Sequence, residues 1–168
     1  MMDLSFNWQI EEFMVYCHTQ QLREKTLTSY EQTLRLFERW CAEQFNITTV
    51  DKVTESIVRR YIIDLQKRGK YSFYVNDKKK ETNFPDRRRD FRKPITTTTI
   101  NNYIRNLRVF FNWLDRDYII TKNPMAKVRQ LKAERKAKEF LSDEEFKCLI
   151  DHLDKSYFSE CRDFTMIM

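Results

Sequence analysis

The sequence predicts an all-α protein, on two observations. The 168 residues include one glycine and three prolines, fewer turn-forming residues than a strand-rich fold needs. Apolar residues also recur at helical spacing over several long stretches, most clearly between Thr96 and Tyr118. Hydrophobic residues make up 41% of the chain. This is enough for the core of one domain, or of one small domain plus part of another.

The composition indicates which binding partners and which cellular compartment the protein can have. The 31 basic against 25 acidic residues leave a net charge of +6, which is compatible with a nucleic-acid partner but also occurs in unrelated proteins. The four cysteines form no C-x-x-C pair. No signal peptide and no apolar run near about 18 residues is present, so we expect a cytoplasmic protein without a membrane segment. Cys148 and His152 lie four residues apart, but a metal site would need further ligands. We expect no metal and no cofactor.

The 96–118 stretch predicts a helix with two distinct faces. Its apolar residues recur at i, i+4, i+7, i+11 and i+14, and they are Ile100, Ile104, Leu107, Phe111 and Leu114. A second face carries groups that hydrogen-bond or neutralise phosphate, and these are Asn101, Arg105, Arg108 and Asn112. Such an acid-free face suits the major groove of DNA. The alternative, a solvated face on an ordinary core helix, is equally open from this stretch alone.

The N-terminal part predicts two further helices. The first covers 7–21, with an inner face of Ile10, Phe13, Met14 and Cys17. The second covers 26–45, with a core stripe of Tyr30, Leu34, Phe37 and Cys41. A second stripe on that helix again pairs basic and polar groups without an acid, although Glu31 and Glu38 flank it. Its members are Lys25, Thr28, Gln32, Arg35 and Arg39. Two helices with the same kind of face favour nucleic-acid binding over a solvated surface.

A third helix and an unusual insertion follow. Thr54 is the expected N-cap of a helix that runs to Arg68, with Gly69 as the residue that ends it. Residues 70–95 then carry a lysine triplet (78–80), an arginine triplet (87–89) and two prolines. Residues 71–84 read as a small β-hairpin. The charge places this insertion near a phosphate backbone, and a solvated loop is the equally weighted alternative.

The C-terminal part predicts a linker and the start of another domain. Residues 127–139 are basic with little to bury and read as a linker. Ser142 and Glu145 have the spacing of a capping box, which opens a helix expected to bury Phe146, Leu149, Ile150 and Leu153. The chain then ends on the apolar run 164–168, which indicates a truncated second domain.

The order of these parts resembles the N-terminal half of tyrosine recombinases, the phage integrase family. The most specific stretch begins at Thr99-Ile100, continues through Asn123-Pro124 and a basic linker, and reaches Phe140-Leu141-Ser142-Asp143-Glu144-Glu145. It is similar to the run that joins that family's core-binding domain to its catalytic domain. The stripe of Leu27, Tyr30, Leu34 and Phe37 also resembles the family's second helix. Each piece is weak alone, whereas the combination is specific and covers most of the chain.

The resemblance implies a SAM-like, four-to-five-helix orthogonal bundle at 1–126, a linker at 127–139, and one or two helices of the catalytic domain at 140–168. It implies duplex DNA as partner. The DNA-facing residues would come from the 96–118 helix with the hydroxyls at its start, from the second helix, and from the linker. They would be Thr97, Thr98, Arg105 and Arg108, then Lys25, Gln32, Arg35 and Arg39, and then Lys132, Arg135, Lys136 and Lys138. The insertion at 70–95 departs from the family's short turn.

The implied function is the DNA-binding portion of a site-specific recombinase, the integrase of a phage or mobile element. Further protomers would assemble on DNA with the full-length protein. The family's first catalytic arginine follows a Thr-Gly-x-Arg motif after an Arg-Asp like Arg162-Asp163, and this sequence ends before that motif. We therefore expect no catalytic residue here and no activity from this chain alone. The alternatives are a free-standing helical regulatory or architectural DNA-binding protein, or a helical protein-interaction domain.

Overall fold

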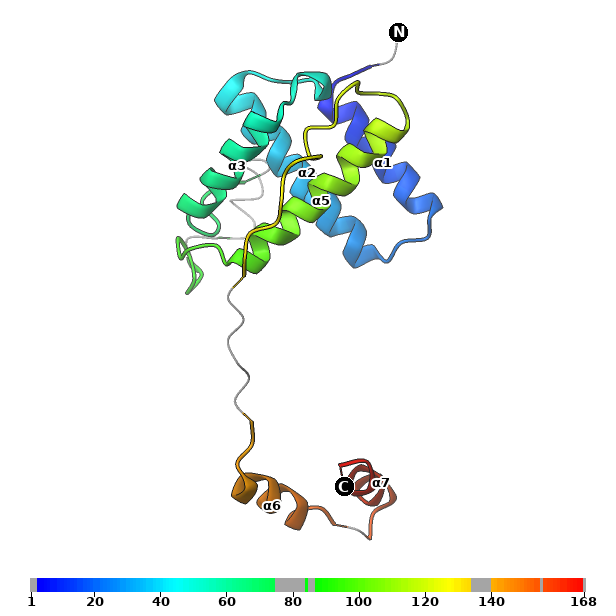
Figure 1. Cartoon of the computed structure of the whole chain (residues 1–168), viewed down its shortest axis with the longest axis vertical. Helices are drawn as coiled ribbons and strands as arrows, with labels where there is room; N and C mark the ends of the chain where they lie inside the picture. Colours follow the sequence, from blue (N-terminus) through cyan, green and yellow to red (C-terminus); the bar gives the residue numbers. More distant parts are fainter. Residues whose placement is uncertain (1–2, 75–83, 85–86, 134–139, 155, 168) are drawn as a thin grey trace. The chain divides into compact units, whose positions relative to one another are not determined.

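The computed structural model describes residues 3–74, 84, 87–133, 140–154 and 156–167. The chain divides into two compact units, Met1–Ala133 and Glu134–Met168 (Figure 1). Every regular element in the described part is a helix, and the β-type pairings there are two isolated bridges. The all-α prediction is confirmed. Within the described residues, no helix combines the length and apolarity that crossing a membrane requires.

In its described residues the first unit is a bundle of four α-helices. They are α1 (Phe6–Thr19), α2 (Glu24–Phe45), α3 (Glu55–Lys67) and α5 (Thr97–Arg116), with a short 3-10 turn, η1, at Val50–Lys52. Helix α2 contacts α1, α3 and α5, and α5 also contacts α3. Figure 1 shows α5 crossing α2. Helices α2 and α5 therefore form the centre of the bundle, and their outer edges can carry a shared site.

Helix α5 supplies much of the core. Its predicted apolar face is confirmed, because Ile104, Leu107, Phe111 and Leu114 are fully buried and Ile100 is 2% exposed. The helix begins where its sequence indicates, since the Thr96 hydroxyl accepts a hydrogen bond from the Thr99 amide at 3.3 Å. Aromatic rings from other helices pack on the same core, including Phe37, whose ring lies edge-on to that of Phe111 with centroids 6.1 Å apart. The buried face fixes which side of α5 is left for function.

Gly69 has a different role from the predicted one. Helix α3 ends at Lys67, and Gly69 does not adopt the left-handed conformation of a helix-ending glycine. Instead, a Cβ atom on Gly69 would overlap the Arg92 backbone at its Cα. Glycine therefore allows the two ends of the insertion to meet. They pair through a bridge between Gly69 and Pro94 and through the Lys70 amide, which donates to the Lys93 carbonyl at 2.9 Å.

The predicted hairpin at 71–84 is not seen in the described part of that segment. Residues 71–74 form turns and bends rather than a strand. Residues 75–83 lie outside the described residues, and with them the lysine triplet.

The second unit contains α6 (Asp143–Asp151) and α7 (Phe158–Ile167). The predicted capping box is present, because the Ser142 hydroxyl accepts from the Glu145 amide at 3.2 Å and the Glu145 carboxylate accepts from the Ser142 amide at 2.9 Å. The predicted burial is wrong. Phe146 is 37% and Leu149 44% exposed, and Ile150 and Leu153 are only half-buried. Helices of nine and ten residues cannot enclose a core by themselves.

The cysteine and histidine of α6 stay close together. The Cys148 sulfur lies 3.7 Å from His152 Nδ1. In the part of the chain that the structure describes, no group of three or more metal-ligating side chains forms.

Candidate nucleic-acid interface

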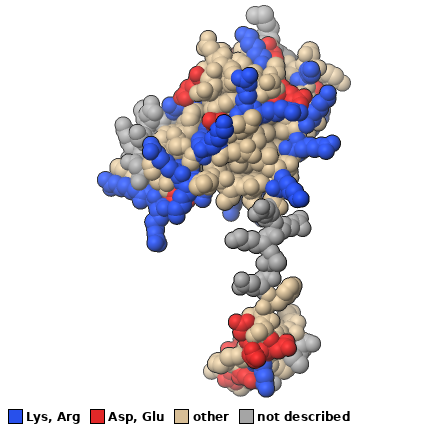
Figure 2. Space-filling model, turned by 60° about the vertical axis from the view of Figure 1, so that its left-hand side comes forward, with Lys and Arg blue, Asp and Glu red and all other residues tan. Residues whose placement is uncertain are grey.

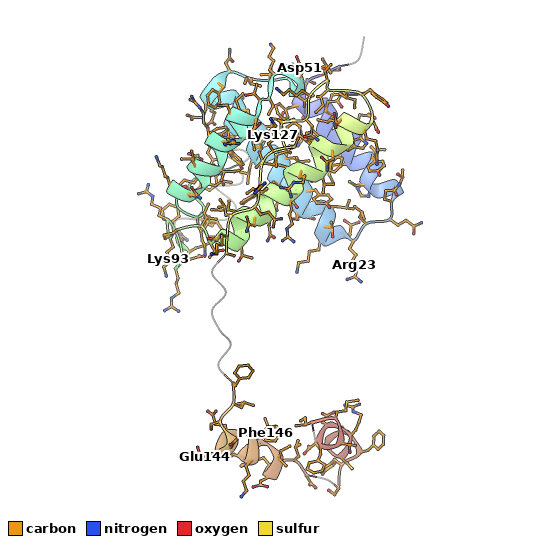
Figure 3. All side chains as sticks on the ribbon, in the orientation of Figure 1. Arg23, Asp51, Lys93, Lys127, Glu144 and Phe146 are labelled. Atoms are coloured by element: carbon orange, nitrogen blue, oxygen red, sulfur yellow. The ribbon has the colours of Figure 1, made fainter. Side chains whose placement is uncertain are left out.

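A basic hollow lies between the first turns of α2 and the middle of α5. Its volume is about 660 Å³, and no Asp or Glu is among the described residues that line it. Arg23, labelled in Figure 3, marks the end of the hollow at the start of α2. The lining residues are Arg23, Lys25, Thr26, Ser29, Tyr30, Asn102, Arg105, Asn106, Arg108 and Val109. We call this the α2–α5 hollow.

A buried amide holds the two walls of the hollow together. Asn106 is 9% exposed. Its Nδ2 donates to the Thr33 hydroxyl at 2.9 Å, and to the Ser29 carbonyl and hydroxyl oxygens at 3.2 and 3.1 Å. A buried amide paired in this way fixes how α5 sits on α2. Because the backbones on both sides are fixed, the basic side chains that they carry start from fixed points on the two helices.

Three cations at the rim have no carboxylate partner among the described residues. Arg23, Lys25 and Arg105 are exposed, and no ion pair among the described residues involves any of them. Arg105 donates to the side-chain oxygen of Asn102, which is neutral and leaves the charge of the guanidinium uncompensated. Uncompensated cations around a concave surface attract an anion from solution.

The polar edge of α5 also makes hydrogen bonds to another segment of the chain. Asn101 donates to the Leu131 carbonyl at 2.9 Å and accepts from the Leu131 amide at 2.8 Å. Arg108 donates to the Val128 carbonyl at 2.7 Å. The side-chain oxygen of Asn112 accepts from Asn123 at 2.8 Å. Three of the four residues predicted to face DNA thus hold the returning segment 123–131. The irregular backbone of that segment needs these hydrogen-bonding partners.

Substituting Asn101 tests this clamp. Asn101→Ala removes two hydrogen bonds to one peptide segment, and at about 0.5–1.5 kcal/mol each we expect the free energy of unfolding to fall by about 1–3 kcal/mol. Hydrogen exchange at the Leu131 amide should accelerate more than global unfolding accounts for. Asn102→Ala, one residue along and exposed, is the matched control. Equal exchange at Leu131 in both variants would contradict the clamp.

The predicted stripe on α2 divides into two halves. Lys25, Thr28 and Gln32 are exposed. Arg35 lies 3.5 Å from a carboxylate oxygen of Glu11 on α1 and 3.4 Å from one of Glu38. Burial raises the pKa of Glu38, and Arg35 opposes that shift. The first half of the stripe is thus continuous with the hollow, whereas Arg35 belongs to a network of intramolecular ion pairs.

Arg39 is also bound within the protein. Its Nε donates to Glu43 at 2.6 Å, and its Nη1 donates to the Tyr74 carbonyl at 3.0 Å. Any contact from Arg35 or Arg39 to DNA stays a prediction that has to compete with these bonds.

The remaining predicted residues lie at the ends of α5 and its returning segment. Thr97 is half-buried and Thr98 exposed in the first turn of α5, and Lys132 is exposed. Val128 is 6% exposed and Leu131 packs against the core, so the predicted linker at 127–139 starts as a packed segment. Arg135, Lys136 and Lys138 lie outside the described residues.

Sequence reasoning missed Arg23, Asn102 and Asn106. Arg23 falls between the two predicted N-terminal helices, but its position directly before α2 places it at the hollow. Asn106 shares a helical stripe with Tyr103, Phe110 and Trp113, and a lone amide in an apolar stripe is a signal for a buried hydrogen bond.

Known proteins are similar to this chain in sequence and in fold. The model of the phage integrase N-terminal SAM-like domain matches residues 10–74. A tyrosine recombinase of Thermosipho africanus is 27% identical over 159 residues, covering 94% of this chain and 47% of that protein. The tyrosine recombinase XerC of Listeria monocytogenes serotype 4b is 28% identical over 140 residues, covering 83% of this chain and 38% of that protein. The chain thus spans less than half the length of either relative.

A solved structure has the same fold. The Tn1549 transposon integrase, in complex with a circular intermediate DNA, superposes with a TM-score of 0.54 at 15% identity, covering 96% of this chain and 42% of that one. This likeness shows that the two proteins share a fold. The sequence matches support the tyrosine recombinase family expected from the order of motifs, and residues 10–74 match the model of the phage integrase N-terminal SAM-like domain.

Proposed function

We propose that this chain binds duplex DNA as part of a site-specific recombinase and that the α2–α5 hollow is where it holds the phosphate backbone. One observation carries the proposal. Arg23, Lys25, Arg105 and Arg108 surround a single hollow whose described lining contains no carboxylate. Lys and Arg arranged in this way are the usual ligands of DNA phosphates. The DNA complex of the Tn1549 integrase, which has the same fold, supports this assignment.

The rim residues divide between positioning and sequence reading. Lys25 and Arg105 are exposed and are our candidates for phosphate contacts, which set the register of the protein on the duplex. Thr28 and Gln32 continue the exposed stripe of α2 beyond the hollow. Their hydroxyl and amide groups are suited to base edges in the major groove, where Gln pairs with adenine. Thr97 and Thr98 start α5, where a helix N-terminus and hydroxyl groups favour a further phosphate.

The similarity to tyrosine recombinases extends the proposal to the whole protein. Such a recombinase would break and rejoin DNA through a phosphotyrosine intermediate, would act with further protomers on DNA, and would serve the integration or excision of a phage or other mobile element. The chain described here would contribute grip and part of the sequence reading.

A salt series on the wild-type chain tests the proposal. We expect it to bind a duplex of about 30 base pairs, with log affinity falling linearly with log salt at a slope of about −0.9 per phosphate contact. Fluorescence anisotropy of an end-labelled duplex measures this. A helical protein-interaction domain would show no binding, or weak binding without a linear salt dependence, and either result would contradict the proposal.

A further inference from the structure

The insertion that follows α3 carries exposed arginines outside the residues matched by the family model. Its described part, residues 69–74, 84 and 87–95, is called here the insertion stem. Arg87, Arg88, Arg89, Arg92 and Lys93 are all exposed. The acidic residue described within the stem is Asp90, and one of its carboxylate oxygens lies 3.5 Å from Lys70 Nζ. The five exposed cations therefore keep an excess of positive charge.

Backbone hydrogen bonds close the base of the insertion stem. The Lys70 amide donates to the Lys93 carbonyl at 2.9 Å, and the Arg92 amide donates back to the Lys70 carbonyl at 3.0 Å. Two further turns close within it, because the Phe91 amide donates to the Arg88 carbonyl at 3.0 Å and the Lys93 amide to the Asp90 carbonyl at 3.1 Å. The close approach at Gly69 keeps the two ends together. Its arginines thus project from a hydrogen-bonded backbone.

Aromatic rings support three of these guanidinium groups, those of Arg87, Arg88 and Arg92. The Arg88 guanidinium lies 4.7 Å from the centre of the Tyr71 ring, and that of Arg87 lies 4.6 Å from the centre of the Phe84 ring. Arg92 has the same relation to Phe91 at 5.3 Å. A guanidinium stacked on a ring keeps its in-plane N–H donors available, and these donors match phosphate oxygens. The stacking also restricts the side chain before binding, which lowers the entropy cost of a contact.

The stem lies at the same end of the first unit as the α2–α5 hollow. In Figure 3, Lys93 and Arg23 mark the two lower corners of the bundle, and the start of α5 lies between them. Figure 2 shows Lys and Arg side chains gathered at the lower left of the first unit with few Asp or Glu side chains among them. A rod-shaped polyanion that contacts the hollow can therefore continue along this end of the bundle.

We propose that the insertion stem is a second phosphate-binding surface for duplex DNA, separate from the α2–α5 hollow. The inference rests on the proposed function, since it assigns further contacts to the same duplex. Arg87 and Arg89 contact backbone phosphates beyond those held by Lys25 and Arg105. The stem thereby lengthens the DNA segment that the first unit covers and raises affinity without reading bases.

A charge-neutral double variant tests the stem. Arg87→Gln/Arg89→Gln in the full chain should flatten the salt slope by about one per lost phosphate contact, up to about two, on the 30-base-pair duplex. Lys52→Gln/Lys122→Gln removes two exposed cations from η1 and the segment after α5, and it should keep the wild-type slope. Lys25→Gln/Arg105→Gln serves as the reference for the hollow. Circular dichroism melting checks that each variant folds.

The outcomes separate the stem from the hollow. If the stem variant keeps the wild-type slope while the hollow variant loses slope, the stem proposal is overturned and the proposed function stands. If wild type does not bind duplex DNA, the proposed function fails and the stem proposal with it. If the stem and control variants lose equal slope, the effect is one of net charge, and this also overturns the stem. If the losses of salt slope add when the stem and hollow substitutions are combined in one protein, this supports two separate surfaces.

Discussion

Leu107→Ala is expected to lower the free energy of unfolding by about 2–5 kcal/mol. Leu107 is fully buried at the centre of the apolar stripe of α5. Truncation removes buried methyl and methylene groups and leaves a cavity that a close-packed core refills only in part. Because α5 contacts both α2 and α3, the core cannot close over the cavity by moving one helix alone. Urea denaturation followed by circular dichroism measures the change as a lower midpoint.

The matched control is on the same helix. Val109→Ala removes apolar atoms from a side chain that is 41% exposed, and it should change stability by no more than about 0.5 kcal/mol. A Leu107→Ala midpoint equal to that of Val109→Ala would mean that this face of α5 is not buried. The orientation of its polar edge, and the α2–α5 hollow with it, would then be wrong.

The sequence was sufficient where the determining contacts are local. The apolar period of α5, the Thr96 cap and the Ser142–Glu145 capping box are each encoded within a few neighbouring residues. A helix and its buried side follow from such patterns. The basic character of the faces on α2 and α5 also followed from spacing, and it led to Lys25, Arg105 and Arg108, which the structure brings to one hollow.

The sequence did not reveal the intramolecular partners of polar residues where those partners are distant in the chain. Asn101 holds the backbone of Leu131, thirty residues away, and Arg35 lies near Glu11, twenty-four residues away. Periodicity separates a buried face from an exposed one, but it does not tell which exposed groups a returning segment will cover. Gly69 shows the same limit, since its close neighbour is Arg92 in the returning arm of the insertion.

The burial predicted for α6 failed for a related reason. The period of Phe146, Leu149, Ile150 and Leu153 correctly indicates one apolar face, yet a face is buried only when another element covers it. Among the described residues of the second unit, none is buried. An apolar stripe therefore predicts which side of a helix can be buried, and it does not predict that another element covers that side.

Lys25→Gln/Arg105→Gln is expected to weaken duplex binding by roughly 60-fold at about 0.1 M salt. Each phosphate contact contributes about 0.9 to the slope of log affinity against log salt. It therefore raises affinity close to eightfold at about 0.1 M salt relative to about 1 M salt, and the factors for two contacts multiply. Both side chains are exposed and no ion pair is found for either among the described residues. Their loss should therefore leave the melting midpoint nearly unchanged, which separates a binding defect from an unfolding one.

The slope of log affinity against log salt for this variant tests the central claim most directly, because it counts phosphate contacts at the α2–α5 hollow. The comparison is with Lys52→Gln/Lys122→Gln, which carries the same net charge but keeps the hollow intact. Our account predicts that the slope falls by about two in the hollow variant and stays at the wild-type value in the control. Equal slopes in the two variants, with both proteins folded, would contradict it and move the DNA interface to another face.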